Sequence, residues 1–201
     1  MECILRCDRT LWKCRRTVQA VVLAGCVVLA GAACGPEAPE GWGQWQHEGD
    51  ILLASSAPRG GKLIAMYDFD AAIPVYENVR VGSFVLYTAT EPGFELLAFD
   101  DAARRSYALP NGVGLALEVV ELDSGVAVKI EGQILDSPGS RKTLGTTPDL
   151  HAHPEWQVAV PVTSSQERYR IRFRLVSESQ GYESSDVYTV TLVLSGNGQA
   201  S

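Results

Sequence analysis

The stretch YRIRFRLV, residues 169–176, decides the fold class because apolar and arginine side chains alternate along it. In an extended strand, successive side chains point to opposite faces. The alternation therefore predicts a strand with one buried face and one water-exposed face, which carries Arg170, Arg172 and Arg174. No segment of the chain shows a convincing 3.6-residue period, so the sequence predicts strands rather than helices.

Further apolar segments lie on both sides of this strand, separated by turn residues. The turn at 123–125 joins the segments 114–121 and 126–131 and predicts a β-hairpin. We predict a loop at 137–148, and Pro161 predicts an edge position for its strand. The fold class is therefore all-β, a single antiparallel β-sandwich of immunoglobulin-like or jelly-roll-like type. The other predicted strands are 62–69, 83–88, 94–99, 157–162 and 186–194.

The chain has three histidines, and two of them, His151 and His153, lie one residue apart. In an extended segment both imidazoles point to the same side, which is what binding one metal ion requires. The third, His47, lies close to Asp50 near the start of the predicted domain. The spacing alone also fits histidines of a surface loop that bind nothing. Trp156, just beyond, is typical of a core anchor whose indole N–H finds a partner.

The first 34 residues have the composition of an export signal. Basic residues precede an apolar run at 18–33, which is shorter than the roughly 20 residues that a membrane-spanning helix needs. The run ends in small residues before Cys34 and resembles the lipobox of bacterial lipoproteins, whose cysteine is lipidated and becomes the mature N-terminus. We expect lipidation at Cys34. Cys26 is the alternative lipidation site, because LAGC at 23–26 matches the lipobox better. A protein that is secreted, or that keeps this segment as a single membrane span, is the other interpretation.

These signals predict three parts: a lipoprotein-type signal peptide at 1–33, a lipidated tether at 34–46 and a β-sandwich domain at 47–197. All five cysteines lie within the first 34 residues, so the predicted domain has no disulfide and no cysteine nucleophile. Residues 1–34 contain five basic and two acidic residues, which leaves 12 basic and 22 acidic residues, a net charge of −10, for the remainder. Such a body repels phosphate backbones, so we expect no nucleic-acid partner.

Three segments resemble the C-terminal half of the surface-anchored repeat domain: LHAHPEW at 150–156, YRIRF at 169–173 and SSDVYTVTL at 184–192. HEGD at 47–50 is similar to the short element with which that domain opens. The family occurs in exported bacterial proteins encoded with metal-type ABC transporters. The chain departs from the family in its single copy and in having no histidine at 62–70.

The resemblance implies that His47 joins His151 and His153 at one zinc site. Its fourth ligand would be water or a carboxylate, for which Asp50, Asp149 and Glu155 are candidates. Histidine ligands suit zinc, copper or nickel better than magnesium or calcium.

We therefore expect a lipid-anchored protein of the bacterial cell envelope, facing the periplasm or the exterior, that binds a transition metal, zinc first, through His47, His151, His153 and Asp50. The expected partners are the lipid bilayer, through the acyl anchor, and a metal ABC transporter or another envelope protein.

We do not expect an enzyme, because the chain lacks a nucleophile elbow, a phosphate-binding loop and a His-Glu-x-x-His motif. Two alternatives remain at this point. One is a surface adhesion or protein-interaction module with no metal site. The other is a hydrolase that uses an acidic pair such as Asp100 and Asp101.

Overall fold

The computed structural model describes residues 49–179 and 181–195. All of them belong to one compact unit, Gly43–Ser201. The predicted signal peptide, both candidate lipidation sites, Cys26 and Cys34, the tether and His47 lie outside the described residues. Among the residues that are described, no helix is long and apolar enough to cross a membrane.

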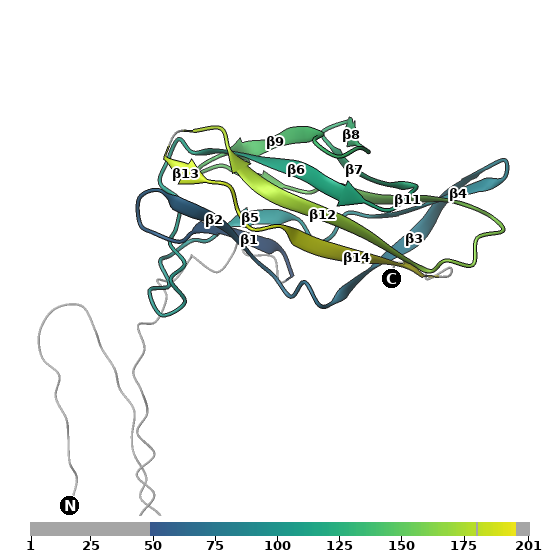
Figure 1. The fold of residues 1–201 in the computed structure, drawn as a ribbon, viewed down its shortest axis with the longest axis horizontal. Helices are drawn as coiled ribbons and strands as arrows, with labels where there is room; N and C mark the ends of the chain where they lie inside the picture. The colour runs from purple at the N-terminus through teal and green to yellow at the C-terminus, as the bar shows by residue number, and fades with distance from the viewer. Residues whose placement is uncertain (1–48, 180, 196–201) are drawn as a thin grey trace, which may run out of the picture. The chain divides into compact units, whose positions relative to one another are not determined.

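The described chain is all-β and forms a sandwich-like arrangement, which confirms the predicted fold class (Figure 1). A five-stranded sheet has the order β10-β5-β1-β2-β13, and a nine-stranded sheet has the order β8-β7-β11-β4-β3-β14-β12-β6-β9. Most neighbouring strands are antiparallel, but β1 with β5, β2 with β13 and β3 with β14 are parallel.

The five-stranded sheet consists of β1 (Ile51–Ser55), β2 (Gly61–Met66), β5 (Phe94–Leu96), β10 (His151–Ala152) and β13 (Tyr182–Glu183). The nine-stranded sheet consists of β3 (Ala72–Val81), β4 (Phe84–Ala89), β6 (Gly114–Leu122), β7 (Val126–Ile130), β8 (Gln133–Leu135), β9 (Arg141–Thr146), β11 (Glu155–Pro161), β12 (Arg168–Ser177) and β14 (Tyr188–Ser195).

The core forms where aromatic rings from both sheets meet. Phe94 of β5 packs edge-to-face on Phe173 of β12, with 5.9 Å between ring centroids. Trp156 of β11 lies 6.3 Å from Phe94, and all three side chains are fully buried. Burial of such large apolar surfaces is the main favourable term in folding. These contacts fix β5 and β11 in the core. The segment with His151 and His153 pairs with β5 and leads directly into β11, so both of its neighbours are held in place.

The alternation along β12 is present as predicted. Tyr169, Ile171, Phe173 and Leu175 are buried, whereas the arginines between them are exposed or half-buried. Each of three arginines pairs with an acid on the neighbouring β6 side: Arg174 with Glu118, Arg172 with Glu121 and Arg170 with Asp123. The outer face of this strand is therefore a row of ion pairs.

The predicted hairpin between β6 and β7 is wrong. β6 pairs with β12 and β9, whereas β7 pairs with β11 and β8. Asp123 continues the β6–β12 pairing, because its N–H donates to the Arg170 carbonyl and its side chain accepts from the Arg170 N–H. Gly125 then redirects the chain with φ +83° and accepts a hydrogen bond from the Ala159 N–H of β11.

The predicted loop at 137–148 is also wrong in part, because β9 forms within it and pairs with the free side of β6. The border strands of the nine-stranded sheet come close together: the Gln133 side chain of β8 donates to the Arg141 carbonyl of β9 at 3.1 Å.

Pro161 does not lie on an edge strand. Its strand, β11, lies between β7 and β4, but the pairing with β7 ends at Val158, so the missing N–H of Pro161 falls where no partner needs it.

Candidate metal centre

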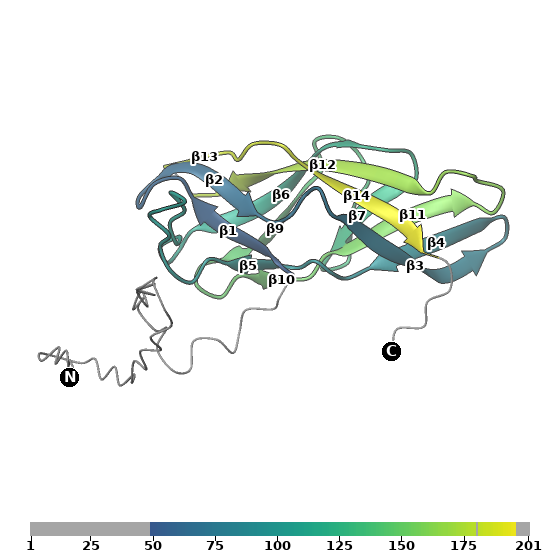
Figure 2. The ribbon, with the colours of Figure 1, turned by 90° about the horizontal axis from the view of Figure 1, so that it is seen from below.

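The centre forms at one end of three neighbouring strands, β10, β5 and β1 (Figure 2). β1 and β5 run parallel with Ile51 beside Phe94, and β10 runs antiparallel to β5 with Ala152 beside Phe94. Ile51 and Phe94 are fully buried in the core. Adjacent positions along a strand face opposite sides. The positions next to this row therefore lie on the opposite face of the sheet, and they include Asp50, which is buried there, and both histidines, which are exposed.

Two imidazoles and one carboxylate meet on this outer face. The Nε2 atoms of His151 and His153 are 2.7 Å apart, which confirms that the two side chains point to the same side. One ligand atom each of Asp50, His151 and His153 lies within 4.8 Å of the other two. Both histidines are exposed and Asp50 is only 6% exposed, so the donors form a site with a buried floor and an outer rim.

The Asp50 carboxylate is held in place by one of its oxygens. Oδ1 accepts a hydrogen bond from the Gly93 N–H at 2.8 Å. Oδ2 is buried and has no hydrogen-bond partner in the described part of the chain. A buried carboxylate oxygen without a partner is costly and calls for a physical explanation. A cation bound between Asp50 and the imidazoles would supply the missing interaction.

The absence of a side chain at position 93 makes room for these groups. A Cβ built on Gly93 would lie 2.8 Å from Nδ1 of His153 and 3.1 Å from Oδ1 of Asp50. Real Cβ atoms essentially never come as close as the distance to His153, and the distance to Asp50 is tighter than nine in ten real Cβ contacts. Glycine therefore lets His153 and Asp50 approach the β5 backbone from the same side.

A second carboxylate, that of Glu91, contacts the imidazole of His153. Oε1 of Glu91 lies 3.3 Å from Nδ1 of His153, and its Oε2 accepts from the Gly93 N–H at 3.2 Å. The turn that carries Glu91 is fixed to the core, because Nε1 of Trp156 donates to the Pro92 carbonyl at 3.1 Å. A carboxylate on the far nitrogen of a metal-ligating histidine orients the ring and increases its basicity.

The structure brings together three of the four predicted metal ligands, Asp50, His151 and His153, and the fourth, His47, is outside the described residues. Glu155, a candidate carboxylate, instead lies 3.5 Å from Nζ of Lys129. Sequence reasoning missed Glu91.

The acidic pair Asp100 and Asp101 has a local structural role. Oδ1 of Asp100 accepts from the Ala108 N–H, and Oδ1 of Asp101 accepts from the Arg104 N–H. Both side chains thus fix the backbone of the same loop, as Asp side chains in turns commonly do.

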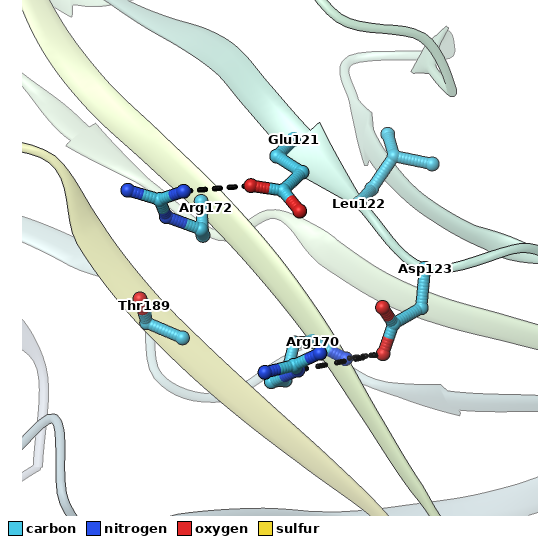
Figure 3. A pocket seen from close by; sticks show the side chains of 6 residues that line it. All are labelled: Glu121, Leu122, Asp123, Arg170, Arg172 and Thr189. Carbon is cyan, nitrogen blue, oxygen red and sulfur yellow. Dashed lines mark hydrogen bonds and ion pairs between the residues drawn. The ribbon is translucent and has the colours of Figure 1, made fainter.

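A pocket of about 360 Å³ lies on the nine-stranded sheet, lined by residues of β6, β12 and β14 and by Asp123 (Figure 3). Its acids are paired with arginines: Nη1 of Arg172 is 2.6 Å from Oε2 of Glu121, and Nε of Arg170 is 3.7 Å from Oδ2 of Asp123. Thr189 of β14 lies on the other side of the arginines. Because each carboxylate faces a guanidinium, the pocket does not present the two cooperating acids that a hydrolase of this class needs.

No protein-family model matches the chain, and no curated protein matches it. Among solved structures, the N-terminal domain of PorA is similar with a TM-score of 0.40 and 9% sequence identity, over 74% of this chain and 100% of that one. A likeness at that level carries no argument about what this protein does. The functional conclusion therefore depends on the geometry of the three donors.

Proposed function

We propose that this chain is an exported, lipid-anchored β-sandwich protein of a bacterial cell envelope that binds a transition metal, with zinc as the expected ion. The observation that supports the metal site is the approach of Asp50, His151 and His153, whose ligand atoms lie within 4.8 Å of one another. Two imidazole nitrogens and one carboxylate oxygen are a donor set typical of zinc and of neighbouring transition metals. His47 is the further ligand that we expect from the sequence.

The burial of the donors supports capture and delivery rather than structural bracing. Structural zinc sites enclose the ion and leave no position open to an outside ligand. Here Asp50 is buried, but His151 and His153 are exposed, so a bound ion would stay accessible from solvent. An accessible ion is one that a second protein could deliver or remove, and a metal ABC transporter of the same envelope is the partner that we expect. We propose no catalytic role.

Zinc titration of the purified, metal-stripped protein tests the site. We expect zinc affinity to fall in Asp50→Asn and in the double variant His151→Ala/His153→Ala, by more than the roughly tenfold that loss of an orienting residue alone typically causes. Asp136→Asn, an exposed aspartate, is the matched control and should bind as the wild type does. Affinity should also fall as the pH is lowered, because protons compete with the metal for imidazole nitrogen.

The metal site would be rejected if the wild type and both site variants bound zinc equally weakly. A protein-interaction module would then be the better conclusion, and one observation favours it. Val79, Val81 and Phe84 of the β3–β4 hairpin and Val162 beside it are 45%, 69%, 52% and 49% exposed. Exposed apolar groups gathered on one hairpin are typical of a contact surface.

A further inference from the structure

Glu95 is a second buried carboxylate on the strand next to the two histidines. The side chain lies in β5 and is 9% exposed, and its Oε2 atom has no hydrogen-bond partner. Among the described residues, the buried side-chain nitrogen and oxygen atoms without a hydrogen-bond partner are Oε2 of Glu95 and Oδ2 of Asp50. None of the ion pairs among the described residues involves either acid.

The register of β5 places Glu95 on the face of the metal centre. Positions 93 and 95 share a face of the strand, and Phe94 between them points into the core. A Cβ on Gly93 would touch His153 and Asp50, so this face is the one on which the donors lie. Glu95 is also the direct antiparallel partner of His151. Cβ atoms of such partners are about 4.5–5.5 Å apart. The carboxylate of Glu95 is not among the ligand atoms that lie within 4.8 Å of one another, so its side chain would turn toward the histidines to bind the same ion.

Electrostatics gives the two acids a common explanation. An ionised carboxylate that is removed from water without a hydrogen bond or an opposite charge is strongly unfavourable. Asp50, just before β1, keeps one hydrogen bond, from the Gly93 N–H, but its Oδ2 has no partner, and neither has Oε2 of Glu95 on the adjacent β5. Two like charges on neighbouring strands also repel each other. A divalent cation next to both would compensate two negative charges at once. The imidazoles of His151 and His153 would cover the same ion from the solvent side.

We propose that Glu95 is a ligand of the metal centre, so that two imidazoles and two carboxylates of the described residues bind one divalent ion. This inference rests on the proposed metal-binding function and adds a residue that the sequence pattern did not indicate. A second carboxylate makes the donor set harder, and carboxylate donors suit Mn²⁺ as well as zinc. The site should therefore bind Mn²⁺ measurably, in addition to zinc.

The test compares wild-type full-length protein with Glu95→Gln and with Glu167→Gln, an exposed glutamate of the β11–β12 loop that serves as the matched control. Each metal-stripped protein is titrated with zinc and, separately, with Mn²⁺, and its melting temperature is recorded with and without zinc. We expect Glu95→Gln to lower zinc affinity at least tenfold and Mn²⁺ affinity by a larger factor. Its metal-free melting temperature should stay equal or rise, because a buried unpaired charge is gone, while the zinc-induced rise should shrink.

Each result has a distinct meaning. Wild-type zinc affinity in Glu95→Gln would overturn the ligand role of Glu95 and leave the proposed function intact. No zinc binding by the wild type would overturn both. If Glu95→Gln did not fold, Glu95→Asp would replace it, because it keeps the charge and withdraws the carboxylate by one methylene group. Undiminished zinc affinity in that variant would equally reject a direct bond to the metal.

Discussion

Gly93 leaves open the space in which the side chains of His153 and Asp50 approach β5. It also donates its N–H to Oδ1 of Asp50 and, more distantly, to Oε2 of Glu91. One backbone position thus determines how closely the buried Asp50 carboxylate and the exposed His153 imidazole approach each other. The requirement is steric rather than conformational, because the clash is with side-chain atoms of the site itself.

At this residue we predict that Gly93→Ala lowers zinc affinity at least about tenfold, because displacing an orienting or ligating group typically costs that much. The added methyl group would force the His153 ring and the Asp50 carboxylate outward. Isothermal titration measures the effect. Gly139→Ala is the control, since it strains a backbone with φ +82° where nothing lies within 4 Å. It should destabilise the fold by about 1 kcal/mol and leave zinc affinity unchanged. Wild-type affinity in Gly93→Ala would show that the metal ligands do not depend on the space at position 93.

Single residues of the centre differ in how far the sequence predicts them. The common direction of His151 and His153 follows from the two-residue period of an extended chain, and the structure confirms it. Glu91 and Glu95 could not be found in this way. Glu91 contacts His153, and Glu95 is placed opposite His151, because β5 and the turn before it lie beside β10, which is more than fifty residues away in sequence. No local pattern reports such a pairing.

At the scale of the elements, β14 ties the two sheets together. Tyr188 of β14 belongs to the nine-stranded sheet, yet its hydroxyl accepts a hydrogen bond from the Ala65 N–H of β2 at 3.0 Å. Its ring also stacks on Phe69, with 4.7 Å between centroids. Burial raises the pKa of the Tyr188 hydroxyl above the usual value for tyrosine. The tie between the sheets is therefore made by a neutral hydroxyl.

This contact predicts a loss of stability at alkaline pH. A tyrosine of the unfolded chain ionises near pH 10, whereas Tyr188 in the folded protein keeps its proton to higher pH. The folded state then binds more protons, so the contribution of Tyr188 is complete below pH 10 and is lost as the pH rises through its raised pKa. Tyr188→Phe should flatten this decline and cost about 1–3 kcal/mol at pH 8, because the Ala65 N–H loses its acceptor.

Urea unfolding at a series of pH values from 8 to 11 measures both effects. Tyr76→Phe, at a tyrosine of β3 that is 43% exposed, is the control and should follow the wild type. A decline equally steep in wild type and Tyr188→Phe would show that other groups cause it.

Strand neighbours were harder to predict than strands. The alternation at 169–176 indicates both faces of β12, because each residue responds to its own burial. The short turn at 123–125 suggests a hairpin, but the β6 backbone is already paired on both sides, with β12 and β9. Competition among all strands for backbone partners decides the order of a sheet, and a short turn is only one contribution to it.

At the scale of the whole molecule, the sequence predicts an acidic domain attached to a membrane by Cys34. In cells, Cys34→Ser should abolish incorporation of labelled fatty acid and move the protein from the membrane fraction to the soluble fraction, because serine cannot form the thioether. Cys26→Ser should retain both the label and the membrane location. The reverse pattern would assign the anchor to Cys26, and labelling of both variants would reject a single lipidated cysteine. Zinc affinity should be the same in both variants.

The strands that border the two sheets also affect how neighbouring molecules interact on a crowded surface. β10 and β13 have two residues each, β8 has three, and β9 begins with Arg141 and Lys142 and is bridged to β8 by Gln133. Short or positively charged borders offer few free amide groups to a strand of another molecule. If the proposed lipid anchor concentrates copies on a bilayer, we expect them to stay separate rather than polymerise through their backbones. The proposed metal centre beside β10 would then stay open to a second protein.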